Sequence, residues 1–294
     1  SKSKKYLKKI QQSTVYDVAN ITPLSSASYL SKEIKNNVFL KREDLQPVFS
    51  FKLRGAYNKI SLIKEKGDVE RVITASAGNH AQGVAYSARK LKLKSTIVMP
   101  VTTPSIKVKA VKNLGAKVVL VGDSYDDAYV HAIKLSKNPK FAFVHPFDDP
   151  DVIAGQGTIG KEILDECDKK IDAVFVPVGG GGLIAGIGAY IKNLEPSIKI
   201  IGVEPKEAAG LYESIKANRR VTLKEVGLFV DAVAIKQVGK VTFPIIKECI
   251  DEVVTVTVDE ICAAVEDIFQ ETRSISEPAG ALSLAGLKKL AKSR

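Results

Sequence analysis

The alternation of apolar, strand-like runs with helical patterns is the feature that most constrains how this chain folds. Helical patterns of about ten to fifteen residues separate successive runs, which is the spacing of β-α-β units. In such units the strands pair in parallel and the helices cover both faces of the sheet. The sequence therefore predicts an α/β fold with parallel sheets. The strand-like runs lie at residues 72–73, 95–99, 117–121, 142–144, 173–178 and 199–203.

A lysine at the start of a predicted helix is the strongest candidate for chemistry. Lys52 follows Phe49 and Phe51 and precedes Arg54 by about half a helical turn. A protonated amine is a weak nucleophile, but partial desolvation beside the two phenylalanines, with the positive charge of Arg54 nearby, would favour the neutral form, which can bond to an aldehyde. Because most lysines are exposed, an ordinary solvated helix lysine is the alternative for this segment taken alone.

Four consecutive glycines form the second candidate site. Gly179, Gly180, Gly181 and Gly182 stand between an apolar β-rich run and a helical pattern. Glycines adopt positive φ and have no Cβ to hold a ligand away, so several backbone N–H groups and the positive end of the helix can converge on a phosphate. A plain tight turn is the alternative. The dinucleotide fingerprint G-x-G-x-x-G and its acidic ribose partner are missing, which favours a phosphate without a dinucleotide.

A third junction of strand and helix carries a run of small and polar residues, from Thr74 to Gly83. Ser76 is a good helix cap, and capping alone would explain it. The same exposed N–H groups can also receive a carboxylate, and Asn79 can donate a hydrogen bond to a phenolic oxygen. Together, the three segments match pyridoxal phosphate and an amino-acid substrate.

The chain resembles the catalytic part of the biosynthetic threonine deaminases (threonine ammonia-lyases) of the plant and fungal kind, which are fold-type-II enzymes related to tryptophan synthase β. The matching runs follow the family's order over nearly all 294 residues. They lie at residues 38–44, 50–57, 75–84, 99–104, 155–158, 177–186, 201–205 and 277–281.

The resemblance implies two open, twisted, parallel-rich sheets with flanking helices. It also implies a large cofactor-binding domain made of residues 1–70 and 149–294, with a small α/β domain, residues 71–148, inserted into it. Cofactor and substrate would lie between these domains, at the carboxyl ends of strands.

The resemblance further implies the site residues and the reaction. Lys52 would hold pyridoxal 5'-phosphate as a Schiff base and then remove the Cα proton of L-threonine, after which the β-hydroxyl leaves and 2-oxobutanoate and ammonia are released. The implied cofactor contacts are Phe51 against the ring, Asn79 on the ring hydroxyl, Gly179, Gly180, Gly181 and Gly182 on the phosphate, and Glu277 near the ring. The implied contacts with the substrate carboxylate are the backbone groups of Ser76, Ala77, Gly78, Asn79 and His80.

For Glu277, an ion pair at the edge of the core is the alternative. No metal site is implied.

Three departures from the family pattern stand out. Ala232 occupies a position where family members carry glycine, and it would cost on the order of 1 kcal/mol if the backbone there has positive φ. The family's last catalytic strand, whose serine bonds the pyridine nitrogen, has no counterpart before Arg294, so we expect weaker cofactor binding and lower stability than in a longer chain. The C-terminal regulatory domain of the family has no counterpart either.

Two alternative functions stay open. One is a degenerate, weakly active or inactive paralogue with a binding or regulatory role. The other is a serine racemase or serine/threonine dehydratase. A racemase needs a second base where this chain has Ala77, and its metal site uses an aspartate where this chain has Gly210.

Composition excludes several other classes of protein. Cys167, Cys249 and Cys262 lack the spacing of a disulfide framework or a zinc site. The net charge of +11 comes from lysines scattered among acidic residues, so nucleic acid is not expected as a partner. No apolar run reaches membrane-spanning length, and we expect a soluble protein.

The lysine-rich start, residues 1–10, fits a docked helix with Tyr6, Leu7 and Ile10 on one apolar stripe better than a targeting peptide. The resemblance suggests a plastid or mitochondrion as location. It also suggests a homo-oligomer, a dimer or a tetramer.

Overall fold

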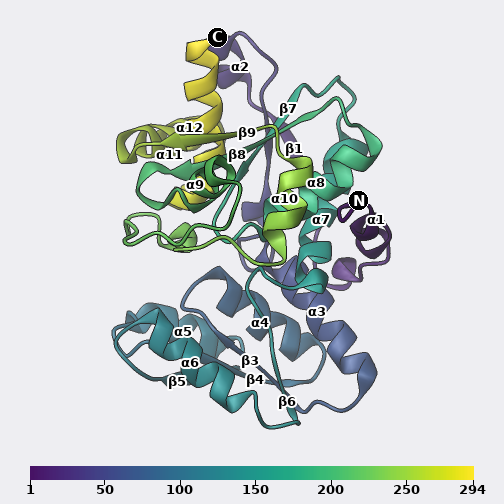
Figure 1. The fold of residues 1–294 in the computed structure, drawn as a ribbon, viewed down its shortest axis with the longest axis vertical. Coiled ribbons are helices and arrows are strands. Elements are labelled where there is room, and N and C mark those ends of the chain that lie inside the picture. The colour runs from purple at the N-terminus through teal and green to yellow at the C-terminus, as the bar shows by residue number, and fades with distance from the viewer. The chain divides into compact units, whose positions relative to one another are not determined.

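A computed structural model describes residues 1–294, and the chain forms two compact units (Figure 1). The first unit comprises residues 1–11, 22–42 and 157–294, and the second comprises 12–21 and 43–156. Residues 71–148, expected as an inserted domain, fall inside the second unit. That unit also takes in the helix that begins at Lys52. The domain boundaries of the family stay a prediction for this chain.

The second unit is built on a parallel four-stranded sheet with the strand order β5-β4-β3-β6. Residues along its strands alternate between the two faces, as a pleated strand requires. Ile97 and Met99 pack with the helices on one face, whereas Ile73 and Val98 pack against α6 on the other. The elements of this unit are η1 (Val15–Asp17), η2 (Glu43–Leu45), α3 (Lys52–Lys66), β3 (Arg71–Ala75), α4 (Asn79–Lys90), β4 (Lys94–Met99), α5 (Ser105–Asn113), β5 (Lys117–Leu120), α6 (Tyr125–Leu135), β6 (Phe141–Phe143) and the start of α7 (Pro150–Glu166).

The first unit holds a parallel three-stranded sheet, β7-β8-β9, and a short antiparallel pair, β1-β2. Helices α11 and α12 cover the apolar residues of β8 and β9. The elements of this unit are α1 (Lys4–Gln11), β1 (Leu24–Ser26), α2 (Ser28–Ile34), β2 (Phe39–Lys41), the end of α7, β7 (Ala173–Pro177), α8 (Gly182–Leu194), β8 (Lys199–Pro205), η3 (Lys206–Ala208), α9 (Gly210–Ala217), η4 (Asp231–Val233), α10 (Thr242–Cys249), β9 (Glu252–Val256), α11 (Val258–Thr272) and α12 (Pro278–Ser293).

These sheets confirm the predicted fold class. All six predicted strands are present with bounds shifted by at most a few residues, and β1, β2 and β9 were not predicted.

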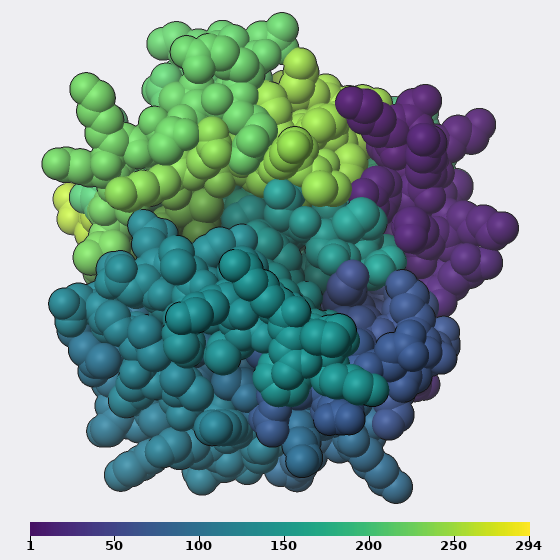
Figure 2. All heavy atoms as spheres, turned by 60° about the horizontal axis from the view of Figure 1, so that its bottom comes forward, coloured from purple at the N-terminus to yellow at the C-terminus, as the bar shows by residue number.

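The lysine-rich start of the chain forms a docked helix, as expected. Tyr6 and Ile10 are buried, while Lys8 and Lys9 are exposed. Helix α1 packs on α8, and the backbone N–H of Ser3 donates to the carboxylate of Glu248 on α10 at 2.8 Å. In Figure 2 the purple N-terminal residues lie against the yellow-green surface of the segment that contains α10. None of the helices combines the length and the apolar composition that a membrane span requires.

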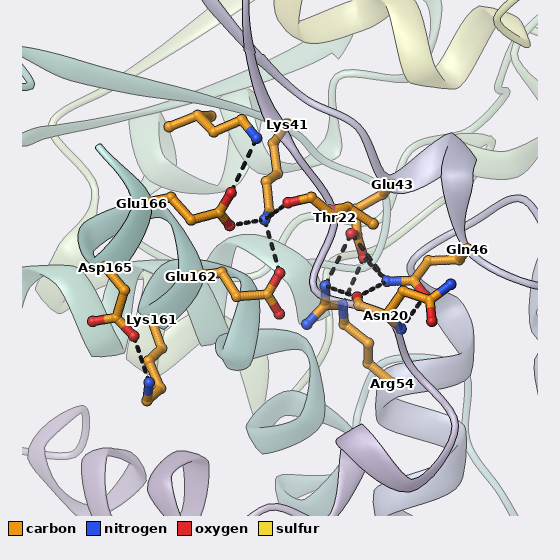
Figure 3. A network of polar contacts seen from close by, with 11 residues as sticks. Asn20, Thr22, Lys41, Glu43, Gln46, Arg54, Lys161, Glu162, Asp165 and Glu166 are labelled. Atoms are coloured by element: carbon orange, nitrogen blue, oxygen red, sulfur yellow. Dashed lines mark hydrogen bonds and ion pairs between the residues drawn. The ribbon is translucent and has the colours of Figure 1, made fainter. Parts of the chain in front are cut away.

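Each unit holds a buried ionic network near a place where the chain passes from one unit to the other (Figure 3). In the first unit, Lys41 Nζ donates to the Thr22 carbonyl at 2.7 Å and to Glu162 and Glu166 at 2.8 and 2.6 Å.

In the second unit, the guanidinium of Arg54 pairs with Glu43 through two bonds, of 2.6 and 2.9 Å. The same guanidinium donates to the Asn20 carbonyl at 3.4 Å, which Gln46 also binds. The networks therefore hold distant chain segments together within each unit.

Candidate active site

Lys52 is the first residue of α3, and its side chain lies against other parts of the second unit. The hydroxyl of Ser50, two residues before the helix, accepts a hydrogen bond from the Lys52 N–H at 3.4 Å. Lys52 Nζ donates to the carbonyl of Pro146 at 3.1 Å and lies 5.5 Å from the centroid of the Phe51 ring. The amine therefore has an aromatic neighbour on one side and a carbonyl acceptor on another.

Phe49 and Arg54 do not act on the Lys52 amine as predicted, Phe49 by desolvating it and Arg54 by placing a positive charge beside it. Phe49 has positive φ and is 76% exposed, so it points its ring to solvent instead of covering the amine. Arg54 is fully buried, but its charge is matched by the bidentate pair with Glu43. Of the three predicted neighbours, only Phe51 lies at the amine.

The Ser76 loop, residues 76–78, joins β3 to α4. Together with the first turn of α4 it provides both a side-chain cap for the helix and backbone N–H groups that a carboxylate could bind. The Ser76 hydroxyl accepts hydrogen bonds from the N–H groups of Gly78 and Ala81, at 3.2 Å each, so it caps the start of α4. The N–H groups of Ala77 and His80 donate to no acceptor within the protein. Two donors at a helix N-terminus suit a carboxylate.

His80 fastens this loop to the end of β6. Its Nε2 donates to the Val144 carbonyl at 3.0 Å, and its Nδ1 is buried without a partner. Burial, with a smaller contribution from the Lys52 charge, lowers the pKa of His80 to about 3. The ring is therefore neutral at neutral pH.

A glycine lets α4 approach the head of α3. A Cβ at Gly83 would lie 3.1 Å from the carbonyl carbon of Lys52 and from the N of Leu53. The close approach brings the Ser76 loop and Lys52 together on one side of the second unit's sheet, at the carboxyl ends of its strands.

The glycine loop of the first unit has the geometry of an anion cradle. Gly181 has φ of +100° and directly precedes α8, which begins at Gly182. The N–H groups of Gly179, Gly180, Gly181 and Gly182 donate to no acceptor within the protein, whereas the Gly180 carbonyl accepts from Gly239 N–H at 3.0 Å and from the Thr242 hydroxyl at 2.7 Å. The carbonyl is thus turned away and the donors are left for a ligand. A phosphate dianion fits this loop.

Adding side chains to the glycine loop would distort it. A Cβ at Gly181 would lie 2.6 Å from a methyl of Ile246, and one at Gly179 would lie 3.3 Å from the Cα of Val233. Gly181 is therefore required by packing as well as by backbone conformation, whereas a side chain at Gly179 would make only a tight contact.

The remaining predicted positions also lie in the first unit. Glu277 is exposed and stands at the N-cap of α12, followed by Pro278. Ala232 lies exposed in η4 and does not have positive φ, so the strain considered for it is absent.

Glu204, at the end of β8, is almost fully buried and accepts hydrogen bonds from the N–H groups of Leu211 and Tyr212 at 2.7 and 3.0 Å. These bonds cap α9, the helix that begins at Gly210.

Sequence reasoning missed the groups that support the candidate residues. Pro146 and Thr242 lie 94 and 62 positions from the residues they bind, Lys52 and Gly180. Contacts over such separations leave no local pattern. The run Val144-His145-Pro146 directly after a strand was the one signal that pointed to a functional turn.

Comparison with known proteins places the chain in a family. The sequence profile described as "Pyridoxal-phosphate dependent enzyme" matches residues 15–294. The chain belongs to this family. Its cofactor is accordingly pyridoxal phosphate, as predicted.

The names of individual relatives are more specific than the description of the family. The chain is 55% identical to a biosynthetic L-threonine dehydratase of Burkholderia multivorans over 96% of its length and 56% of that protein. It is 54% identical to the mitochondrial threonine dehydratase of Saccharomyces cerevisiae over 97% of its length and 50% of that protein. The chain therefore spans about half the length of these curated relatives.

Among solved structures, the processed form of threonine deaminase isoform 2 from Solanum lycopersicum superposes with a TM-score of 0.96 at 49% identity, covering 98% of this chain and 79% of that one. The predicted resemblance to threonine deaminases is confirmed. The predicted site residues are divided between the units: Phe51, Lys52 and residues 76–80 lie in the second, the glycine loop and Glu277 in the first. Their assignment to one site stays a prediction.

Proposed function

We propose that this chain catalyses the pyridoxal-phosphate-dependent dehydration and deamination of L-threonine to 2-oxobutanoate and ammonia. The observation that carries the proposal is the agreement, over nearly the whole chain, with proteins named threonine dehydratase and threonine deaminase. Capture of an amino-acid substrate is consistent with the donors left without protein acceptors in the Ser76 loop.

Pyridoxal phosphate would be held by the residues that the sequence predicts for it. Gly179, Gly180, Gly181 and Gly182 would bind its phosphate through their N–H groups, and Lys52 would bond to its aldehyde. Phe51 would lie against its ring, with Asn79 at the ring hydroxyl and Glu277 near the ring. When bound, the cofactor withdraws electrons from the Cα of the amino acid and so makes the Cα proton removable.

The protein's own residues would orient the substrate and move the proton. The N–H groups of Ala77 and His80 would receive the substrate carboxylate, with the Ser76 hydroxyl holding the loop in shape. Lys52 Nζ would take the Cα proton as general base. Because His80 is neutral, it adds no positive charge beside Lys52.

The racemase alternative has less support. Racemisation needs a second base on the opposite face of Cα. Ala77 stands at that position, and its methyl group has no lone pair to accept a proton. Glu204 is already used in capping α9, and Gly210 has no side-chain carboxylate to act as a metal ligand. The degenerate-paralogue alternative loses one of its reasons, because Ala232 has an unstrained backbone.

A substrate assay tests the proposed function. The purified chain, loaded with pyridoxal phosphate, is given L-threonine or L-serine, and 2-oxo acid and ammonia are measured. We expect turnover of L-threonine in preference to L-serine, no D-serine by chiral chromatography, and no turnover by Lys52→Ala. Lys64→Ala, an exposed lysine on the same helix, is the matched control and should behave like the wild type. Formation of D-serine would contradict the proposal.

Two coarser expectations also stay proposals. We propose a homo-oligomer, a dimer or a tetramer, which light scattering of the purified chain would test. An organellar location is supported by the yeast relative, named mitochondrial, and opposed by the equally similar bacterial relative. Fractionation of the source cells decides this point.

A further inference from the structure

A turn with an unusual internal hydrogen-bond pattern follows β6. His145 Nδ1 accepts hydrogen bonds from two backbone N–H groups of its own turn, that of Phe147 at 3.2 Å and that of Asp148 at 2.8 Å. Backbone N–H groups can only donate, so Nδ1 must present its lone pair. The neutral ring therefore carries its proton on Nε2, and a protonated ring would lose both bonds.

Aromatic side chains hold the His145 ring in place. The rings of Tyr129, Phe143 and Phe147 meet it edge-on, with centroid separations of 6.4, 6.0 and 4.7 Å. Burial lowers the pKa of His145; the Asp148 carboxylate opposes this effect and the Lys52 charge adds to it. The titratable groups around the ring are Lys52 on α3, His80 on α4, Tyr129 on α6, and Asp148 and Asp149 on the turn itself.

Both ends of the turn are anchored. At its start, the Val144 carbonyl accepts from the Thr74 hydroxyl at 2.8 Å and from His80 Nε2 at 3.0 Å. At its end, Asp149 pairs with Lys59 at 2.8 Å and accepts from the Asp151 N–H at the start of α7, also at 2.8 Å. The anchors leave the conformation between them to be set by the internal bonds of His145.

The carbonyl of Pro146 is the group that this conformation presents. It lies one residue after His145 and accepts the hydrogen bond of Lys52 Nζ at 3.1 Å. A lysine amine sits on four rotatable bonds, so a fixed acceptor restricts where the amine can be found.

We propose that His145 is a positioning residue: its ring closes the turn that presents the Pro146 carbonyl to Lys52, and this hydrogen bond places the amine for proton transfer. The inference rests on the proposed function, because it concerns the Lys52 amine acting as a base. His145 itself touches neither substrate nor reacting atoms in this role.

Two variants of His145 separate its acceptor from its ring. In His145→Asn, the amide oxygen can accept from the N–H groups two and three residues on, as asparagine does in turns, so the turn is retained. In His145→Phe, the flat aromatic ring is retained and the acceptor is lost. Both are compared with the wild type as full-length, cofactor-loaded protein.

The first readout is independent of activity. Hydrogen exchange of the Phe147 and Asp148 amides should be faster in His145→Phe and unchanged in His145→Asn. The second readout is steady-state kinetics with L-threonine. Misplacing a catalytic group by about 1 Å can cost about 100-fold, so we expect kcat per cofactor-loaded site to fall about 10- to 100-fold in His145→Phe, with KM altered less than about 3-fold. His145→Asn should stay within about 3-fold of the wild-type kcat.

Each outcome bears on the proposal. Faster exchange in His145→Phe with an unchanged kcat would show that the turn is only structural, and equal kinetics for the two variants would also overturn the proposal. If His145→Phe does not fold, ¹⁵N NMR of wild-type His145 decides, since an Nδ1 that carries a proton at neutral pH is incompatible with the turn described. A wild-type chain that does not turn over threonine would instead refute the proposed function.

Discussion

Replacing the buried Glu204 by glutamine should change how the stability of the protein depends on pH. Burial raises the pKa of Glu204 from its ordinary value of 4.5 to about 8, although the two backbone N–H groups that it accepts act in the opposite direction. Between these two values the folded protein keeps a proton on Glu204 that the unfolded chain has released. The stabilising contribution of the protonated carboxyl is therefore complete below 4.5, declines as the pH rises, and is gone above about 8.

The size of the stability change follows from the interval between the two pKa values of Glu204. One pKa unit corresponds to 1.36 kcal/mol, so the wild type should lose about 3 kcal/mol of unfolding free energy through Glu204 between pH 6 and pH 9. Glutamine does not titrate, but its amide nitrogen cannot accept one of the two backbone bonds, which costs about 1 kcal/mol. Glu204→Gln should be less stable than the wild type by about 1 kcal/mol below pH 4.5, more stable by about 1 kcal/mol at pH 6, and more stable by about 4 kcal/mol at pH 9.

Urea unfolding followed by circular dichroism at several pH values measures this difference. Glu195→Gln, which removes an exposed carboxylate, is the matched control and should leave the pH dependence as in the wild type. If the stability curves of Glu204→Gln and wild type run parallel from pH 6 to pH 9, Glu204 is not protonated in the folded protein and the reasoning is wrong.

Two further substitutions test the glycine loop and a buried network. Gly181→Ala introduces a Cβ at positive φ, 2.6 Å from an isoleucine methyl, and should cost about 1–3 kcal/mol of stability and weaken cofactor binding. Gly179→Ala should do less in the same absorbance titration and thermal melt, since its Cβ would be 3.3 Å from its nearest neighbour; equal losses would count against the cradle. Lys41→Met removes the cation that pairs with the buried Glu162 carboxylate and should cost about 3 kcal/mol of unfolding free energy, whereas Lys170→Met, which breaks an exposed pair, should cost less than about 1 kcal/mol. Similar melting temperatures for these two lysine variants would contradict the assigned role of the network.

Local patterns in the sequence were sufficient for most of the fold. The strands β3, β4 and β8 are buried along nearly their whole length, and β7, although mostly half-buried, is apolar throughout, so each was recognisable as a compact, mainly apolar run. Strand β9, Glu252–Val256, escaped because Glu252 and Thr255 interrupt its apolar residues. The pair β1-β2 escaped because both strands include polar residues and show no continuous apolar run, unlike the equally short β6.

The candidate site divides in the same way. Lys52, the Ser76 loop and the glycine loop could be recognised from the sequence, because each has a distinctive composition at the start of a predicted helix. Their supports do not, because the bond from Lys52 to Pro146 and the one from Thr242 to Gly180 join residues far apart in the chain.

Backbone conformation overturned one expectation and decided a second point that the sequence left open. Phe49 adopts positive φ, which turns its ring outward, and Ala232 does not adopt the positive φ that would have strained it. Side-chain direction at such positions depends on φ, which spacing along the sequence does not specify for residues other than glycine and proline.

Trapping the cofactor on the protein tests the central claim most directly. The loaded chain is treated with borohydride, which makes the bond between cofactor and amine permanent, and is then digested and mapped by mass spectrometry. We predict that the phosphopyridoxyl mass is found on the peptide that contains Lys52, and that Lys52→Ala takes up none at any site while keeping the wild-type circular dichroism. Labelling of another lysine in the wild-type chain, or threonine turnover by folded Lys52→Ala, would contradict the account.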